Sequence, residues 1–220
     1  MPEPRGSRDR PKPKTRYHHG DLKEALLLAA YALVAERGAE NFLLSDACKR
    51  AGVSTAAPYK HFRNRDEVLE LVVARAFDEL TDRSMAAAAA HGEGTLDGII
   101  AMGEAYVRFA TERQPLFRLM FGQHPKLKRA EQVVGDGKRC FTSVIEQVAR
   151  YCERNGVQGE ARTIAIRLWT FVHGTASLLI DEDYAVVAPD LDVMGMVRET
   201  TPLILPLPAK RSGRAKPASR

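Results

Sequence analysis

Residues 44–62 decide the fold, and they read LSDACKRAGVSTAAPYKHF. The spacing predicts a first helix over 44–50 that ends before Gly52, because glycine allows the positive φ needed to reverse the chain. Ser54 is a good N-cap residue and is expected to open a second, short helix over about 55–61. Two short helices joined by a tight glycine turn have the layout of a helix-turn-helix.

The charge of this region distinguishes it from the rest of the chain. Residues 47–65 contain no acidic side chain and five basic ones: Lys49, Arg50, Lys60, Arg63 and Arg65. A helix that enters a DNA groove must approach phosphates, so this asymmetry favours a DNA-contacting surface. The alternative is that many helix–glycine–helix hairpins share this spacing and that the charges form an ordinary solvated face.

The composition indicates a folded protein of one or two domains. The 220 residues are 45% hydrophobic and 28% charged, which is enough for a sizeable core and excludes a wholly disordered chain. The formal charge of +5 is concentrated at the ends. Residues 1–20 hold six basic and two acidic side chains and residues 209–220 hold five basic and none acidic, which leaves −4 for the body. We therefore expect any DNA contact to use the tails and one local patch.

Helical patterns continue on both sides of the motif. Asp21–Glu24 is a capping box that predicts the start of a helix stopped by Gly38, and Asn64–Glu67 is a second capping box that opens a long helix. A loose junction is expected near 86–94. Further helices are predicted over 95–113, 115–122, 126–155, 160–180 and 191–204. No segment shows strand-like alternation, so the predicted fold class is all-α, with a small three- or four-helix N-terminal unit joined by a long helix to a larger bundle.

The cellular location is predicted from what the sequence lacks. No uninterrupted apolar stretch approaches the roughly 18–20 residues that span a bilayer, and the N-terminus has no apolar segment of a signal peptide. The odd number of cysteines (Cys48, Cys140 and Cys152), without a CxxC pair, argues against a disulfide framework and a zinc ribbon. We expect a cytoplasmic protein with no membrane partner.

The first part of the chain contains six short motifs: Tyr17–Leu22 (YHHGDL), Ala29–Ala30, Gly38, Ala51–Ser54 (AGVS), Tyr59–Phe62 (YKHF) and Arg65–Glu67 (RDE). Over about residues 17–80 they resemble the N-terminal domain of TetR-type transcriptional regulators. Further along, Leu168–Gly174 (LWTFVHG) resembles a Trp-x-x-x-His-Gly signature in the ligand domain of one TetR subgroup, and Tyr106–Phe109 and Pro115–Phe121 are similar to it as well.

The match departs from the family pattern at two places. Phe42–Leu43 stands where a Ser or Thr usually precedes the first helix of the motif, so Asn41 or Ser45 is expected to cap that helix instead. Arg65 stands where a Lys usually opens the long helix, which keeps the positive charge. The prolines and alternating charges of residues 1–16 predict a flexible basic arm. With the resemblance, the chain is expected to continue as a DNA-binding domain over 17–64, a ligand-binding and dimerisation domain over 65–204 and a flexible basic tail over 205–220.

The resemblance also implies which side chains contact DNA. The predicted set is Arg16, Lys49, Ser54, Thr55, Ala56, Tyr59, Lys60, His61 and Arg65. Thr55 and Ala56 would face base edges, whereas Tyr59, His61 and Arg65 would hold phosphates and Lys60 would reach either. Ser54 would cap the helix whose N-terminus approaches a phosphate, and Arg16 in the arm would add backbone or minor-groove contacts. Alanine has little to read bases with, so DNA shape is expected to contribute to specificity.

The C-terminal half is expected to hold a small apolar or aromatic effector. The predicted lining is Tyr106, Phe109, Phe117, Met120, Phe121, Trp169 and His173. Trp169 and His173 are four residues apart and share a helix face, so His173 would be the one polar group that orients the ligand. The competing interpretation is that Trp169 fills the core and His173 only satisfies it with a hydrogen bond.

The predicted partners follow from one helix-turn-helix per chain, which reads too few base pairs alone. We expect a homodimer that binds a pseudo-palindromic operator in duplex DNA, most simply as a repressor released by its effector. The residues that could form the dimer interface are Ile164, Leu168, Phe171, Ala176, Leu179, Val193, Met196, Val197 and Leu203. The alternative is that many of them pack in the core of the monomer. The alternatives are a constitutive DNA-binding regulator without a ligand and a helical enzyme that uses His173. No cofactor, metal site or catalytic residue is predicted, since phosphate-loop, nucleophile-elbow and zinc-protease motifs are missing from the sequence.

Overall fold

The computed structural model describes residues 19–122 and 124–206. Its N-terminal part, called the head below, consists of α1 (His19–Arg37), α2 (Leu44–Ala51) and the short 3₁₀ helix η1 (Pro58–Lys60). Gly38 ends α1 as predicted, with a φ of +83° and its amide donating to the Val34 carbonyl at 2.9 Å. The predicted cap at Asp21 is wrong, because α1 already begins at His19 and Asp21 lies inside it.

The turn of the helix-turn-helix forms as predicted, but its second helix does not. Gly52 adopts the left-handed conformation (φ +69°) and ends α2. The expected helix over 55–61 is replaced by turns and one turn of 3₁₀ helix, η1. In an α-helix capped by Ser54, the fourth amide along would bond to the Ser54 carbonyl, and Pro58 at that position has no amide hydrogen. The Ser54 carbonyl accepts from the Ala57 amide instead, at 3.0 Å.

One long helix, α3 (Arg65–His91), connects the head to the rest of the molecule. Asn64 caps it as predicted, since its side chain accepts from the Glu67 amide at 2.9 Å. The Glu67 carboxylate accepts from the Arg63 amide at 2.7 Å, one residue before the partner in a standard capping box. The junction predicted from residue 86 is wrong up to His91: the alanines there favour helix, and α3 ends only at Gly92, whose φ is +101°.

The C-terminal part, called the body below, is built from seven further helices. They are α4 (Leu96–Glu112), α5 (Gln114–Phe121), α6 (Pro125–Arg129), α7 (Glu131–Asn155), α8 (Ala161–Ile180), α9 (Asp183–Val187) and α10 (Val193–Ile204). The helix predicted over 126–155 is divided at Ala130, whose backbone is extended, and α9 was not predicted. The described residues contain no strand, and the all-α fold class is confirmed.

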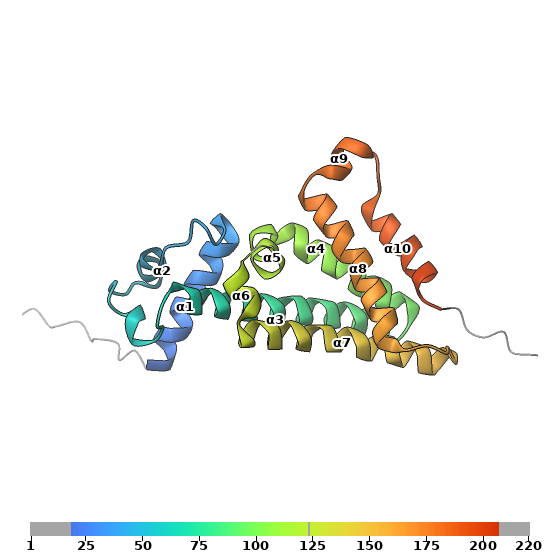
Figure 1. Cartoon of the computed structure of the whole chain (residues 1–220), viewed down its shortest axis with the longest axis horizontal. Helices are drawn as coiled ribbons and strands as arrows, with labels where there is room; N and C mark the ends of the chain where they lie inside the picture. The colour runs from blue at the N-terminus through green and yellow to red at the C-terminus, as the bar shows by residue number, and fades with distance from the viewer. Residues whose placement is uncertain (1–18, 123, 207–220) are drawn as a thin grey trace, which may run out of the picture.

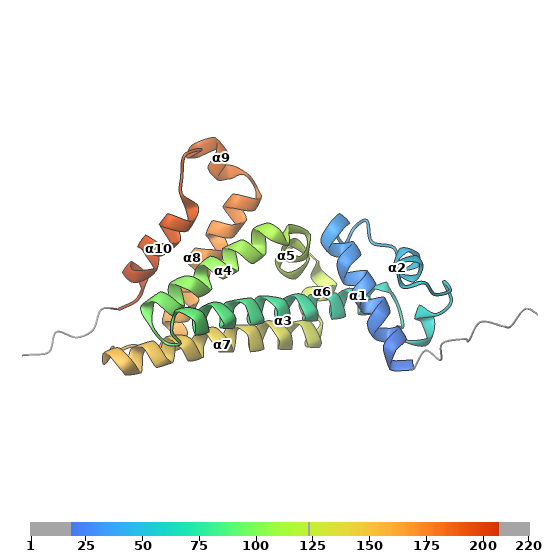
Figure 2. The ribbon, with the colours of Figure 1, turned by 180° about the vertical axis from the view of Figure 1, so that it is seen from behind.

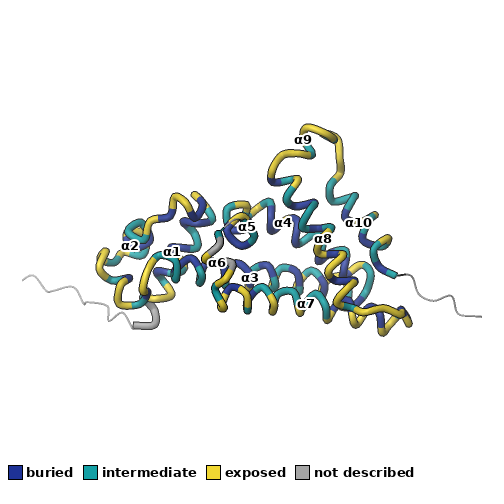
Figure 3. Tube along the Cα trace, in the orientation of Figure 1, coloured by how far each residue is buried: buried dark blue, intermediate teal, exposed yellow. Residues whose placement is uncertain are grey.

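Figures 1 and 2 both show α3 and α7 side by side along the length of the molecule, with the head at one end. α3 packs against α1 in the head and against α4, α5 and α7 in the body. α8 packs against α4 and α7, and the α8–α9–α10 segment projects from the bundle (Figure 1). Burial follows this arrangement: the inner sides of α3 and α4 are buried, whereas α9 is mostly exposed (Figure 3). Because α3 belongs to both parts, a shift of this helix acts on both.

Two sequence predictions concern the ends and the apolar helix. The arm over 1–16, including Arg16, lies outside the described residues, as does the tail from 207 onward. Leu205, the first residue of the predicted tail, is buried in a core cluster with Val148 and Leu168. α8 alone among the described helices is long and apolar enough to cross a membrane, a test that core helices also pass, and here α8 packs against α4 and α7.

Candidate DNA-binding surface and ligand cavity

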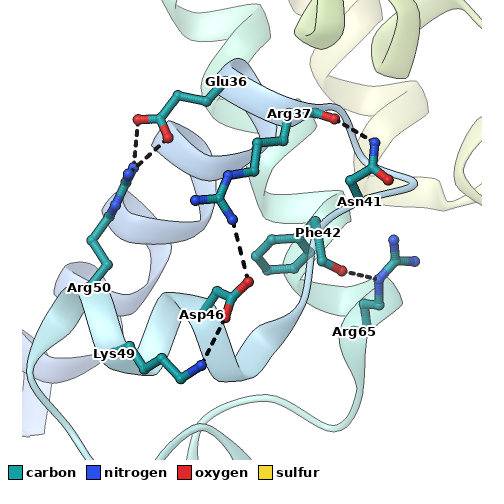
Figure 4. Close-up of polar contacts among 8 residues, drawn as sticks. All are labelled: Glu36, Arg37, Asn41, Phe42, Asp46, Lys49, Arg50 and Arg65. Atoms are coloured by element: carbon teal, nitrogen blue, oxygen red, sulfur yellow. Dashed lines mark hydrogen bonds and ion pairs between the residues drawn. The ribbon is translucent and has the colours of Figure 1, made fainter.

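The basic side chains of α2 are paired with two acidic residues, Glu36 of α1 and Asp46 of α2 itself (Figure 4). Both terminal nitrogens of Arg50 donate to the Glu36 carboxylate at 2.8 Å, and this hydrogen bonding holds the pKa of Glu36 below its ordinary value. Lys49 and Arg37 both contact Asp46, at 3.4 and 3.5 Å. The prediction of an unopposed basic patch is therefore wrong for α2, because packing brings the α1 carboxylate of Glu36 beside Arg50 and Asp46 of α2 itself lies beside Lys49.

The residues around η1 are arranged differently. Ser54, Thr55, Ala56, Tyr59 and Lys60 are exposed, and we call this set the η1 face. Tyr59 is 70% exposed, which is far more than a structural aromatic residue needs. Lys60 makes no ion pair with any residue in 19–122 or 124–206, whereas Arg63 beside it donates to Glu67 at 3.1 Å. The η1 face thus presents two hydroxyls, a phenol and a cation to solvent.

The side chains of His61 and Arg65 are more buried than those of the exposed residues of the η1 face. The His61 ring is half-buried and lies edge-on to Phe62, with 6.4 Å between ring centroids. Arg65 donates from Nε to the Phe42 carbonyl at 3.1 Å and from Nη2 to the Ala39 carbonyl, and its guanidinium lies 5.8 Å from the centre of the Phe42 ring (Figure 4). Arg65 therefore fastens the α1–α2 loop to the start of α3.

The expected caps of α2 are wrong for a related reason. Leu43 occupies the N-cap position of α2 and makes no side-chain cap. Asn41 points the other way and donates to the Arg37 carbonyl at 2.9 Å, so it caps the end of α1 (Figure 4). Ser45 lies inside α2. The loop from Gly38 to Leu43 is held by Arg65 rather than by a capping hydroxyl.

In the body, Tyr106, Trp169 and His173 form one hydrogen-bonded chain. Trp169 Nε1 donates to the Tyr106 hydroxyl at 3.4 Å, and that hydroxyl lies 2.8 Å from His173 Nδ1. Burial raises the pKa of Tyr106, so the phenol stays protonated and its single proton can go to His173. Nδ1 of His173 is then the acceptor, so each hydrogen bond of the chain has one donor and one acceptor.

Two phenylalanines complete an aromatic cluster around the histidine. The His173 ring centroid lies 5.4 Å from that of Phe117 and 4.9 Å from that of Phe121. Both Phe117 and Tyr106 are buried. The chain of hydrogen bonds and the ring contacts fix each other, because a rotation of any one ring would break contacts of the others.

An apolar cavity of about 320 Å³ lies beside this cluster, between α3, α4, α7 and α8. Its wall includes Phe77, Leu80, Thr81, Ser84, Ile99, Met102, Gly103, Tyr106, Phe121, Gly137, Lys138, Cys140, Phe141, Ser143, Val144, Gln147, Val148, Leu168, Trp169, Val172 and Thr201. Several of its hydroxyls are already used, since Thr81, Ser143 and Thr201 donate to carbonyls of their own helices at 2.7–2.8 Å. The cavity can therefore bind an apolar molecule better than a polar one.

The predicted ligand residues divide into two groups. Tyr106, Phe121 and Trp169 line the cavity. Phe117 and His173 lie behind them in the aromatic cluster, and Phe109 and Met120 are buried in the core, with the Arg83 guanidinium 5.7 Å from the Phe109 ring centre. His173 is thus connected to the cavity through its hydrogen bond with Tyr106, as the core-histidine interpretation expects.

The cavity walls formed by α3 and α7 were not predicted from the sequence. Phe77, Leu80, Thr81 and Ser84 follow helical spacing along one side of α3, and Gly137, Cys140, Phe141 and Val144 do so along α7. Both stretches carry an ordinary amphipathic pattern. A cavity wall and a core face have the same apolar periodicity, so this pattern could not distinguish them. No group of three or more His, Cys, Asp or Glu side chains in the described part is placed to hold a metal ion.

The opposite side of α3 carries a charged network that joins head to body. Glu79 accepts a hydrogen bond from Tyr31 of α1 and another from Arg113 at 3.2 Å, and Arg83 lies 2.5 Å from it. Burial alone would raise the pKa of Glu79, but the Tyr31 hydrogen bond and the two arginine charges outweigh it and lower the pKa. Burial, together with the hydrogen bond to Glu79 and the charge of that carboxylate, raises the pKa of Tyr31.

A head in which α2, a glycine turn and a shortened second helix follow one another on a helical body is typical of all-α DNA-binding regulators with a helix-turn-helix. Residues 26–72 match the family model described as bacterial regulatory proteins, tetR family, and residues 99–196 match the model described as tetracyclin repressor-like, C-terminal domain. The chain belongs to the TetR family and is a DNA-binding transcription regulator rather than an enzyme. The Trp-x-x-x-His-Gly subgroup stays a prediction.

Solved structures share the fold. A protein of unknown function from Rhodococcus sp. RHA1 is 28% identical with a TM-score of 0.73, over 87% of this chain and 97% of that one. A tetR-family transcriptional regulator from Streptomyces coelicolor is 14% identical with a TM-score of 0.64, over 84% and 79%. The transcriptional regulator FadR from Bacillus subtilis, in complex with stearoyl-CoA, is 12% identical with a TM-score of 0.62, over 83% and 97%. A comparison with curated proteins found no match.

Proposed function

We propose that this regulator is a homodimeric repressor, and that a small apolar molecule in the cavity releases it from a pseudo-palindromic operator. The observation that carries the proposal is the double role of α3. One side of this helix lines the cavity through Phe77, Leu80 and Thr81, and the other side holds α1 through Glu79 and Tyr31. A ligand that displaces the cavity side must also move the attachment of the head.

The coupling requires that the ligand bind two positions of α3 with different affinity. A typical coupling free energy is about 1–3 kcal/mol, which corresponds to roughly 5- to 150-fold in DNA affinity. The cavity is apolar and partly formed by glycines, so an occupant changes packing rather than hydrogen bonds. The resulting shift would change the spacing of the two heads in a dimer, and half-site spacing is fixed by the duplex.

The exposed apolar side chains of α8 and α10 support the dimer. Ile166 and Leu178 of α8 are 42% exposed and Leu203 of α10 is 83% exposed. Of the predicted interface residues, Ile164, Leu168, Ala176 and Val197 are buried within the monomer and are assigned to the core. Phe171, Leu179, Val193 and Met196 are half-buried and remain candidates for the interface together with Leu203.

The η1 face supports contact with DNA. Thr55, Ala56, Tyr59 and Lys60 are all exposed, and in this proposal the first two reach base edges and the last two reach phosphates. His61 and Arg65 contribute through the protein, by holding the η1 face and the α1–α2 loop. Lys49 remains available as a phosphate contact because its ion pair with Asp46 is exposed and weak.

The comparison with FadR supports an apolar effector, since that regulator shares the fold and is in complex with stearoyl-CoA. A cavity of about 320 Å³ is near the lower end of the usual range of about 300–1,000 Å³. The effector of this protein is therefore expected to be small, or to place only its apolar portion inside.

Selection of bound fragments from a random pool of duplex DNA tests the proposal. A palindromic consensus and a sedimenting dimer are expected, and the bound fragment then serves as probe for an apolar compound library. Val144→Phe, which fills part of the cavity, should keep DNA binding and lose the response to the library. If no compound stabilises the wild-type protein or releases DNA, the constitutive regulator replaces the repressor. If a monomer selects single half-sites, the homodimer part of the proposal is wrong.

A further inference from the structure

Lys138 is the one residue of the cavity lining given above whose side chain carries a formal charge. The other lining residues are apolar or uncharged, and the buried Gln147 is occupied, since its Oε1 accepts from the Gly94 amide at 2.8 Å. A ligand with one ionic group therefore has one place at the wall where that charge is favourable.

Lys138 differs from the neighbouring cations of α7. Arg139 pairs with the buried carboxylate of Asp136, and Arg150 pairs with Glu93. Lys138 is exposed and forms no ion pair within 4.0 Å with any residue of the described ranges. Its stem begins beside Gly137, which also lines the cavity, so the ammonium group can lie at the rim without being buried.

One carboxylate acts on this region from α3. Asp78 is exposed, and its negative charge contributes to the raised pKa of the Cys140 thiol, for which burial is the largest cause. Asp78 does not pair with Lys138 within 4.0 Å, so it weakens the positive potential at the rim without neutralising it. Removing the Asp78 charge should therefore favour an anion at Lys138, which gives a second variant of opposite sign.

We propose that the effector is a small amphipathic organic monoanion whose apolar body fills the cavity and whose carboxylate contacts Lys138. This inference rests on the proposed function, in which the cavity is the effector site. Burial of the apolar body supplies most of the affinity, and the exposed ion pair adds up to about fivefold. The charge thus selects acids over neutral molecules of the same shape.

The experiment uses the only tryptophan of the chain, Trp169, which lines the cavity and reports binding by its fluorescence. Decanoate and 4-phenylbutyrate are titrated beside 1-decanol and 4-phenyl-1-butanol, at one protein concentration, with melting temperature as a second readout. The proteins are wild type, Lys138→Met, Lys138→Arg, Asp78→Asn and Arg154→Met. Arg154 is an exposed cation of the same helix that does not line the cavity, so its variant is the matched control.

An acid of one pair should bind wild type about fivefold more tightly than its alcohol. Lys138→Met should remove this preference and leave the affinity for the alcohol unchanged, Lys138→Arg and Arg154→Met should keep it, and Asp78→Asn should increase it. Equal binding of acid and alcohol to wild type, or an unchanged preference in Lys138→Met, would overturn the anionic effector while keeping the cavity as effector site. Absence of any response to all four probes, in both readouts, would overturn the inference and count against the effector part of the proposed function.

Discussion

The η1 face and the aromatic cluster around His173 hold their side chains in opposite ways. Tyr59 and Lys60 are exposed to solvent on a single 3₁₀ turn, whereas Tyr106, Trp169 and His173 fix one another through hydrogen bonds. A surface that must fit DNA gains from side chains that can adjust, and a cavity gains from walls that are already in place. The position of the η1 face therefore depends on residues outside it, such as Arg65, whereas the aromatic cluster is held by its own internal contacts.

The difference shows that a basic residue close to the η1 face can hold the protein backbone instead of facing solvent. Lys60 and Arg65 are five residues apart, and both were predicted to contact DNA. Lys60 is exposed, whereas Arg65 is partly buried and donates to two backbone carbonyls. Their variants should separate loss of DNA binding from loss of the anchor.

Arg65→Ala is expected to have the largest effect on stability. It leaves the Phe42 and Ala39 carbonyls without their donor, and hydrogen bonds to charged groups contribute about 1.5–3 kcal/mol each. Allowing for partial exposure, we expect a loss of about 2–4 kcal/mol in urea denaturation, with weaker DNA binding as a consequence. Arg63→Ala, which removes an exposed ion pair, should change stability by less than about 0.5 kcal/mol. If the two variants are equally stable, Arg65 does not anchor the α1–α2 loop, and its role is only to contact phosphate.

Much of the fold could be predicted because its signals are local. Gly38, Gly52 and the Asn64 cap set helix ends through their own backbone or side-chain geometry, and all three predictions are confirmed. The errors arise where two local rules compete. Pro58 suits the start of a helix, but four residues after the cap it removes a needed amide, and the second helix of the motif shortens to η1.

The cavity could be predicted only in part because its walls come from distant segments. The motif around Trp169 pointed to the correct helix, and Tyr106 and Phe121 were found with it. Nothing in the sequence distinguishes the cavity side of α3 from its core side. The ion pair between Glu36 and Arg50 in the head could not be predicted for the same reason. The two residues are 14 positions apart in the sequence and meet only when α1 packs on α2.

Tyr106→Phe is the next largest expected effect, and it tests the aromatic cluster. The variant removes the acceptor of Trp169 Nε1 and the donor to His173 Nδ1 while keeping the ring. A buried polar group that loses its partner costs about 1–3 kcal/mol, so the free energy of unfolding should fall by about 2 kcal/mol. Tyr59→Phe, at an exposed phenol, should leave it unchanged. If both variants are equally stable, the hydrogen-bonded chain does not support the cavity.

Lys60→Ala should have a smaller effect, confined to DNA binding. Loss of one phosphate contact should reduce the slope of log affinity against log salt by about 0.9 and weaken binding to all sequences alike. Lys49→Ala is the matched control, because the Lys49 ammonium group already lies 3.4 Å from Asp46. Its slope should change less than that of Lys60→Ala. A larger change in Lys49→Ala would place the main phosphate contact on α2 instead of the η1 face.

The smallest expected effect is a pH dependence that links the two regions through Glu79. The folded-state pKa of Glu79 lies below its ordinary value of 4.5, so its contribution to stability is present above about pH 4.5 and is lost as the pH falls through the folded pKa. Glu79→Gln should therefore be less stable than wild type at pH 7, by up to about 1 kcal/mol because the site is partly exposed, and the difference should narrow below pH 4.5. Glu36 and Glu67, whose pKa values are also lowered, titrate in both proteins and cancel in the comparison. Urea denaturation between pH 3 and 7 measures the difference, and a constant difference across that range would show that Glu79 acts through packing alone.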